Sequence, residues 1–379
     1  MKNIILFLTH FFNNYFPQIL LIYFFMRGDN ILASNIFLSC SFIVIIVNIF
    51  SSNKRSLIIS NFSNRFVNDI IFFRFFFSII IFFGILILKY SFVNISFLLE
   101  QFFLSILFRW IIEIILTKNE LTNNIFKNIK YLIIELFFFI ILFYNFFSKD
   151  IDFLIIPILS LNLIFFFFIL IEIFKIKNIS ANNFIKISIL DLRSLSFVSS
   201  LFLSLSNQAW RLSIYFFVGP KVASIYYTCF ALTSFFGTFM NNSIATYLVK
   251  KKINFIKLYY PIYISLLLVI IIFIYFFSNS LLRMEVNEIT LFNHTLLISF
   301  LGTVLMIRSI YFRHILLIKK FQREVFIEDI KLYIMMIFTV PIFYYIGGPN
   351  SFKYLYFASS TLSLFVYFNL KSLKNVKNN

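Results

Sequence analysis

The chain has 379 residues, of which 61% are hydrophobic and 13% are charged, and its mean hydropathy is +0.94. Soluble domains average roughly half apolar and a quarter charged residues, so this composition excludes a water-soluble globular fold. The net charge is +18, but Lys and Arg lie between apolar runs rather than along one helix face, which argues against a nucleic-acid-binding protein.

Apolar stretches of membrane-spanning length recur along the whole chain. A bilayer core about 30 Å thick needs roughly 20 helical residues. By this measure the sequence predicts an all-α integral membrane protein of about twelve transmembrane helices, at residues 4–25, 31–52, 70–88, 94–116, 129–147, 152–174, 193–218, 222–247, 257–277, 291–312, 330–347 and 352–370. The first stretch has no small-residue cleavage site, so we interpret it as a helix rather than a signal peptide.

The basic residues predict the orientation of these helices. With the N-terminus in the cytoplasm, 22 of the 33 Lys and Arg fall in cytoplasmic segments, 6 in the opposite loops and 5 within predicted helices. The positive-inside rule then places both termini in the cytoplasm. The loops are short, so no extramembrane catalytic domain is expected.

A short pattern occurs twice, about half the chain apart. An Ile-Tyr-Phe-Phe run closes a helix, a turn containing glycine follows, and an Ala-Ser pair opens the next helix. The copies are Ile22–Phe25, Gly28 and Ala33–Ser34, and Ile214–Phe217, Gly219 and Ala223–Ser224. Six predicted helices follow from each start, which predicts a parallel pseudo-repeat of two six-helix lobes, 1–180 and 181–379. Two-lobed transporters of this kind work by alternating access, so the pattern favours transport.

The first helix carries polar residues four apart, His10, Asn14 and Gln18, beside Pro17. A proline in a membrane helix frees a backbone carbonyl and permits bending. We predict Asn14 and Gln18 as substrate-binding residues. His10 titrates near neutral pH and is a candidate for coupling protons to transport, although a histidine at such a place is more often only hydrogen-bonded.

The fourth helix has polar residues at four-residue steps, Gln101, Ser105, Arg109 and Glu113. The spacing of Arg109 and Glu113 predicts an ion pair between them, which is often simply packing. As functional candidates, Arg109 is predicted to bind substrate and Glu113 to take part in ion coupling.

The seventh helix carries a polar stripe whose members mostly step by three or four residues. It comprises Ser200, Ser204, Asn207, Gln208, Arg211 and Tyr215. Charges at bilayer depth cost a few kcal/mol and normally face the bundle interior. Arg211 is suited to holding a phosphate bidentately, and the alternatives are that it snorkels or pairs with a carboxylate. We predict Arg211, Asn207 and Gln208, together with Arg27, as substrate-binding residues.

Other charged residues lie near predicted cytoplasmic helix ends, where a long side chain reaches water easily. We interpret them as anchors: Arg74, Glu135, Glu172, Arg193 and Arg308.

Signals for other chemistry are absent from the sequence. It has no Walker loop, HExxH motif or Gly-rich dinucleotide turn, and Cys40 and Cys229 fall singly inside apolar segments. We therefore expect no metal site, no cofactor and no catalytic residues.

The two six-helix halves and three segments of the seventh and eighth helices resemble the Wzx-type O-antigen flippases, polysaccharide-biosynthesis exporters of the MOP superfamily with a MATE-like fold. The segments are Asn207–Arg211, Ile214–Val218 and Gly219–Tyr227. In that family a helix ends at a short glycine-containing turn and an Ala-x-Tyr run opens the next. Here two residues separate Ala223 from Tyr226, which departs from the family pattern. The resemblance is clearest over 200–250 and fainter over 14–50.

This resemblance implies a flippase of the bacterial cytoplasmic (inner) membrane. Its substrate would be an oligosaccharide linked through pyrophosphate to undecaprenol, moved to the periplasmic leaflet for O-antigen, capsule or exopolysaccharide assembly. The implied partners are membrane lipids, a glycan polymerase and other assembly proteins, and Na⁺ or H⁺ is the candidate coupling ion. Arg211, Arg27 and Arg109 suit the basic cavity of such a protein by charge and depth, but none matches a fixed family motif position.

Two other readings stay open. A multidrug exporter of the same superfamily would usually need an acidic residue in its cavity, whereas the clearest deep charge here is Arg211. A membrane glycan polymerase or glycosyltransferase would be expected to have a larger exoplasmic loop. We therefore expect a transporter rather than an enzyme.

Overall fold

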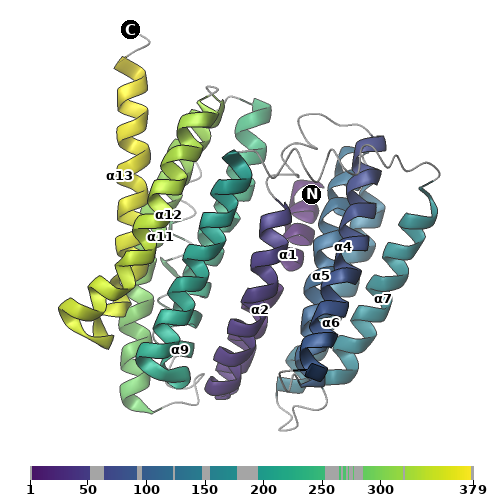
Figure 1. Ribbon diagram of the computed structural model, residues 1–379, viewed down its shortest axis with the longest axis horizontal. Helices are drawn as coiled ribbons and strands as arrows, with labels where there is room; N and C mark the ends of the chain where they lie inside the picture. Colours follow the sequence, from purple (N-terminus) through teal and green to yellow (C-terminus); the bar gives the residue numbers. More distant parts are fainter. Residues whose placement is uncertain are drawn as a thin grey trace. The chain divides into compact units, whose positions relative to one another are not determined.

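The computed structural model describes residues 2–51, 64–91, 96–122, 124–146, 154–176, 195–251, 264–265, 268–269, 272, 276, 285–318 and 321–376. All regular elements in these ranges are helical, as Figure 1 shows. In chain order they are α1 (Lys2–Met26), α2 (Asn30–Ser51), α4 (Asn64–Ser91), α5 (Phe97–Leu121), α6 (Ile125–Phe146), α7 (Ile155–Phe174), α9 (Leu195–Lys251), α11 (Val286–Ile318), α12 (Gln322–Gly347), the 3₁₀ helix η2 (Pro349–Tyr354) and α13 (Leu355–Val376).

The helical fold class predicted from the sequence is confirmed. The element α9 consists of two helices joined at Gly219, whose φ of 77° and ψ of 165° are not helical. With this break, the described helices coincide with every predicted stretch except 257–277, which lies almost wholly outside the described residues. The total of twelve membrane crossings and the cytoplasmic position of both termini stay predictions.

The surface of the helices is that of a membrane protein. Apolar side chains on α6 point outward, with Phe137, Ile140 and Phe143 between 64% and 68% exposed. Soluble monomers rarely expose apolar patches of this kind. Four described helical segments are long and apolar enough to cross a bilayer, Asn30–Val47, Phe66–Ile87, Ile155–Phe174 and Val286–Leu317.

The chain divides into two compact units. Unit 1 comprises Met1–Pro17 and Ser39–Ser200, and unit 2 comprises Gln18–Leu38 and Leu201–Asn379. Helix α1 therefore passes from one unit to the other at Pro17, which lacks the N–H that would continue the helical hydrogen bonding. The lobe boundary predicted at residue 180 lies outside the described residues, and the prediction of two six-helix lobes is untested.

In unit 1, α5 is the central helix and contacts α4, α6 and α7 (Figure 1). It begins where the Ser96 hydroxyl accepts a hydrogen bond from the Leu99 N–H, a side-chain cap for an otherwise unpaired donor. Neighbouring helices cover α5 on several sides, so its polar residues are buried along most of its length. Buried polar groups need partners inside the protein, and this requirement organises the site described below.

The two copies of the sequence pattern share two local features. Gly28 and Gly219 both have positive φ, 87° and 77°, a conformation that glycine adopts without strain. After each turn a serine hydroxyl donates to the carbonyl three residues earlier, from Ser34 to Ile31 at 2.9 Å and from Ser224 to Lys221 at 2.7 Å. The two turns thus share a positive-φ glycine and a serine hydrogen bond, while the six-helix repeat as a whole stays a prediction.

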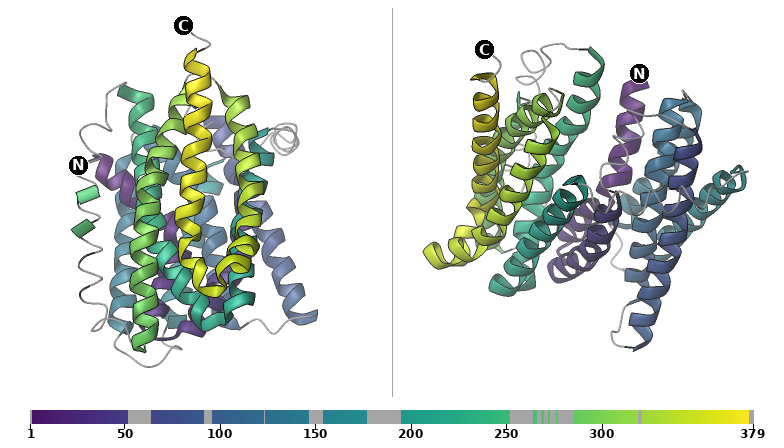
Figure 2. Two further views of the ribbon diagram at one scale, coloured as in Figure 1. Left: turned by 90° about the vertical axis from the view of Figure 1, so that its left-hand side faces the viewer. Right: turned by 45° about the horizontal axis from the view of Figure 1, so that its top comes forward.

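In unit 2, α11 and α13 pack closely along each other (Figure 2). Their approach depends on Gly302 of α11. A Cβ atom at this position would lie 2.8 Å from Tyr356 Cδ1 and 3.0 Å from Phe357 Cα on the facing helix. The second of these is a backbone atom, which cannot move aside as a side-chain end does.

We therefore expect Gly302→Ala to destabilise the protein by about 1 to 3 kcal/mol, the usual effect of overpacking. The measurement is the temperature at which the detergent-purified protein loses its monodisperse peak in size-exclusion chromatography. Gly84→Ala on α4 is the matched control, because no heavy atom lies within 4 Å of a Cβ there. An equal effect of the two substitutions would contradict the role given to Gly302.

Candidate functional site

The interior of unit 1 contains a buried ion pair between α5 and α6. Arg109 Nη2 donates to Glu135 Oε2 at 3.0 Å, and Arg109 Nη1 donates to the other carboxylate oxygen. Arg109 is 2% exposed and Glu135 is fully buried. The contact is bidentate, the strongest geometry for a guanidinium and a carboxylate.

Aromatic rings and polar groups surround the Arg109–Glu135 ion pair. The Arg109 guanidinium lies 4.0 Å from the ring centroid of Phe16 and 5.3 Å from that of Phe165. The Tyr131 hydroxyl lies 2.6 Å from Glu135 Oε1 and 2.9 Å from Asn13 Oδ1, and its single proton serves one acceptor at a time. The pair is therefore desolvated but almost completely coordinated by the protein.

Helix α1 is joined to α5 at the same place by two reciprocal hydrogen bonds. Asn13 Nδ2 donates to the Arg109 carbonyl at 3.0 Å, and Arg109 Nη1 donates to the Phe12 carbonyl at 3.1 Å. These contacts lie four to five residues before Pro17, on the part of α1 that belongs to unit 1. The site thus ties α1, α5 and α6 together.

A second ion pair joins α4 to α5. Arg74 Nη1 lies 2.7 Å from Glu113 Oε2, donates to the Trp110 carbonyl, and its guanidinium stacks 5.0 Å from the Trp110 ring centroid. The predicted pairing of Arg109 with Glu113 is therefore wrong. The two residues face different neighbours, because α4 and α6 contact α5 on different sides.

The interpretation of Arg74 and Glu135 as snorkelling anchors is wrong as well. Arg74 is 1% exposed, and both side chains end in ion pairs inside the bundle. Glu172 is also buried and is held by lysines, while Arg193 lies outside the described residues. Arg308 is exposed, as expected for an anchor.

The other predicted site residues of unit 1 lie on α1. His10 is buried, with Nε2 at 3.5 Å from Glu120 Oε2, so a carboxylate that the sequence analysis did not single out faces the candidate coupling histidine. Asn14 is exposed and accepts a hydrogen bond from Asn13 at 3.2 Å.

In unit 2, the predicted residues Gln18 and Arg27 lie on α1 and in the turn after it. The Arg27 guanidinium pairs with Asp29 at 3.3 Å and donates to the Tyr23 hydroxyl at 3.4 Å. Its side chain is 7% exposed, so Arg27 is engaged in fixing the turn. Gln18 is half-buried.

Arg211 on α9 lies against α2 in unit 2. Its guanidinium sits 4.4 Å from the ring centroid of Phe37, and Phe37 in turn packs against the Tyr227 ring at 5.5 Å. The Tyr227 hydroxyl donates to the Arg211 carbonyl. Arg211 is half-buried, unlike Arg109. A guanidinium whose face rests on a ring presents its N–H groups at its edge, which is how arginine binds phosphate oxygens.

The polar stripe predicted on the seventh helix divides between two environments. Asn207 is exposed, whereas Gln208 and Ser204 are buried. Tyr215, one turn beyond Arg211, donates to Asn35 Oδ1 of α2 at 2.8 Å. Ser200 is half-buried and belongs to unit 1, so Arg211, Asn207 and Tyr215 are the members of the stripe in unit 2 that are exposed or half-buried.

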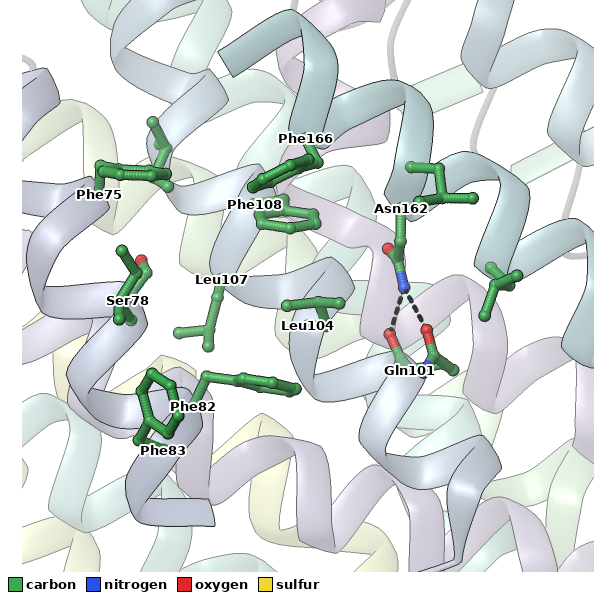
Figure 3. Close-up of a pocket in the computed structure, with 14 residues that line it drawn as sticks. Phe75, Ser78, Phe82, Phe83, Gln101, Leu104, Leu107, Phe108, Asn162 and Phe166 are labelled. Carbon is green, nitrogen blue, oxygen red and sulfur yellow. Dashed lines mark hydrogen bonds between the residues drawn. The ribbon is translucent and has the colours of Figure 1, made fainter. Parts of the chain in front are cut away.

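A pocket of about 400 Å³ lies between α4, α5 and α7 in unit 1 (Figure 3). Phenylalanine and leucine line most of it. At one end Asn162 Nδ2 donates to the backbone and side-chain oxygens of Gln101, at 2.9 and 3.1 Å. No lining side chain is charged, so the pocket does not suit an anionic group.

The sequence analysis assigned Glu135 to the wrong role, that of an anchor, and did not single out Tyr131, although a signal was present. Asn128, Tyr131 and Glu135 follow one another at three- and four-residue steps, the same spacing that identified the stripe on the seventh helix. Among the residues that the structure describes, no three His, Cys, Asp or Glu side chains come together as metal ligands.

Comparison of the sequence with protein-family models and with curated proteins finds no match. Comparison of the fold with solved structures finds a similar one, titled "Inward-facing conformation of a multidrug resistance MATE family transporter of the MOP superfamily". The TM-score is 0.51 at 13% sequence identity, and the similarity covers 99% of this chain and 94% of that one. The chain therefore has a fold like that of a MATE transporter, over its whole length.

Proposed function

We propose that this protein is a transporter that flips a lipid-linked oligosaccharide across the bacterial cytoplasmic membrane. The fold supports transport, since a solved structure with a similar fold is titled a MATE family transporter of the MOP superfamily. The choice of an anionic, pyrophosphate-linked substrate rests mainly on Arg211, a half-buried guanidinium of α9 in a stretch that the sequence predicts to cross the bilayer.

Three carboxylates paired with arginine support an anionic over a cationic substrate. Glu135 pairs with Arg109, Glu113 pairs with Arg74, and in unit 2 Asp329 pairs with Arg313. A carboxylate already neutralised by a bidentate or buried arginine is a poor site for a cationic drug. A carboxylate is thus not available to a cationic substrate at these three positions.

In this proposal the substrate pyrophosphate is held by Arg211 with Asn207 nearby, and the protein alternates between openings to the two leaflets. Arg109 and Glu113 are then structural rather than substrate-binding or coupling residues. His10 with Glu120 is the candidate for proton coupling, with Na⁺ the alternative ion. A glycan polymerase and other assembly proteins are the proposed partners.

The experiment is complementation of a bacterium that lacks its O-antigen flippase. We expect the chain to restore surface glycan, while an empty vector does not. The same plasmid is placed in a strain lacking multidrug exporters and in one lacking its O-antigen polymerase. Restored dye resistance without restored glycan would identify a multidrug exporter, and restored glycan chain length in the polymerase mutant would identify an enzyme.

A further inference from the structure

Three lysines converge on one glutamate where α5 ends, α6 begins and α7 ends. Lys127 Nζ and Lys175 Nζ lie 2.9 and 2.8 Å from Glu172 Oε1, and Lys118 Nζ lies 3.8 Å from Glu172 Oε2. Lys118 also donates to Asn68 Oδ1 of α4 at 3.0 Å. We call Lys118, Lys127 and Lys175 the lysine cluster.

The charges of the lysine cluster exceed what Glu172 neutralises. Three ammonium groups surround a single carboxylate whose side chain is 4% exposed, while the lysines are 19%, 34% and 52% exposed. Burial lowers the pKa of Lys118, Glu172 raises it, and the charges of Lys127 and Lys175 lower it again. Repulsion among the lysines therefore persists, and a second anion would relieve it.

The surroundings place the lysine cluster at a membrane interface. Phe126 and Phe174, the residues directly before Lys127 and Lys175, are 80% and 82% exposed. Large rings exposed beside ammonium groups suit the boundary of a bilayer, where the ring meets hydrocarbon and the cation meets headgroups. The positive-inside rule assigns this end of unit 1 to the cytoplasmic side.

We infer that the lysine cluster binds the phosphate of an anionic lipid, whose chains lie against Phe126 and Phe174. Basic pockets between transmembrane helices on the cytoplasmic side recognise lipid headgroups in this way. Lys127 and Lys175 supply the charge, because they are the more exposed members of the lysine cluster and each also contacts Glu172. This inference does not depend on the proposed transport function.

The test is native mass spectrometry of the detergent-purified protein with four lipids added separately. These are phosphatidylglycerol, cardiolipin, undecaprenyl pyrophosphate and the zwitterionic phosphatidylethanolamine. We expect an anionic lipid to be retained in preference to phosphatidylethanolamine. The double variant Lys127→Gln with Lys175→Gln should weaken the binding of that lipid about thirtyfold, because each lysine near an anionic lipid headgroup contributes roughly 1 kcal/mol. The comparison of the anionic lipids tells whether the ligand is a resident phospholipid or the polyprenyl carrier.

The matched control is Lys221→Gln with Lys331→Gln, which removes two lysines that are also paired with glutamates, at other sites. It should bind the lipid as the wild type does. Size-exclusion chromatography verifies that both double variants are folded. Equal retention of phosphatidylethanolamine by the wild type, or unchanged binding by the Lys127/Lys175 variant, would overturn the inference.

Discussion

Arg109→Ala is expected to destabilise the protein by about 3 to 5 kcal/mol, the largest effect of any single substitution proposed for it. The substitution leaves Glu135 fully buried with Tyr131 as its remaining donor and no cation. It also empties the space between the Phe16 and Phe165 rings and removes the side-chain hydrogen bond to α1. Glu135→Ala should lower the stability by a similar amount, because it leaves the buried Arg109 guanidinium without its carboxylate.

Removing both charges together should be much less harmful. A buried ion pair replaced by apolar residues of similar volume is often neutral or even stabilising, since two desolvated charges disappear with it. We therefore expect Arg109→Leu with Glu135→Leu to regain most of the stability lost in the single variants. The measurement is the melting temperature of the purified protein, arranged as a double-mutant cycle with both single leucine variants.

The control for this series is Arg323→Ala, an exposed arginine at the start of α12. It should leave the melting temperature unchanged. Additive effects of the two leucine substitutions would show that Arg109 and Glu135 are not coupled, contrary to the structure. A stable, monodisperse Arg109→Ala variant that is inactive in transport would instead return Arg109 to the list of substrate-binding residues.

Arg211→Ala is expected to lower flipping at least tenfold without loss of membrane insertion. A charge-assisted hydrogen bond contributes about 1.5 to 3 kcal/mol, and Arg211 is proposed to make a bidentate one to the substrate. Folding should survive, because Arg211 is half-buried and the Tyr227 hydroxyl bonds to its backbone carbonyl, which alanine retains. Arg211→Lys should keep part of the activity, since it preserves the charge but not the planar fork or the stacking on Phe37.

Surface glycan in the flippase-deficient strain measures these variants, with protein in the membrane fraction quantified in parallel. Arg323→Ala again serves as the control for removing an arginine. Full activity of Arg211→Ala at normal membrane levels would remove this residue from the site. If the variant lost both its activity and its presence in the membrane fraction, Arg211 would be required for folding.

The two units use the same means of joining consecutive helices. In unit 1, Arg109 of α5 pairs with Glu135 of α6, and the Tyr131 hydroxyl donates a hydrogen bond to the same carboxylate. In unit 2, Arg313 of α11 pairs with Asp329 of α12 at 2.7 and 3.1 Å, and the Tyr367 hydroxyl of α13 donates to the same carboxylate. Each pair links two helices that follow each other in the chain.

The sequence by itself determined the membrane class and the helices. An uninterrupted apolar run of bilayer length favours a helix in lipid, because a helix satisfies its backbone hydrogen bonds within one segment, so hydropathy located the long helices wherever the structure describes them. It also located the two turns at Gly28 and Gly219, since the conformation that each requires depends on a single residue.

The tertiary structure alone decided which charges meet. Four-residue spacing made Glu113 the expected partner of Arg109, yet the partner is Glu135, 26 residues away on another helix. Spacing along one helix tells which residues share a face, but it does not tell which neighbour covers that face. Because α4 brings Arg74 to Glu113 while α6 brings Glu135 to Arg109, these two ion pairs of unit 1 follow from helix packing. Of the two predicted substrate-binding arginines on α5 and α9, the more accessible is therefore Arg211 and not Arg109.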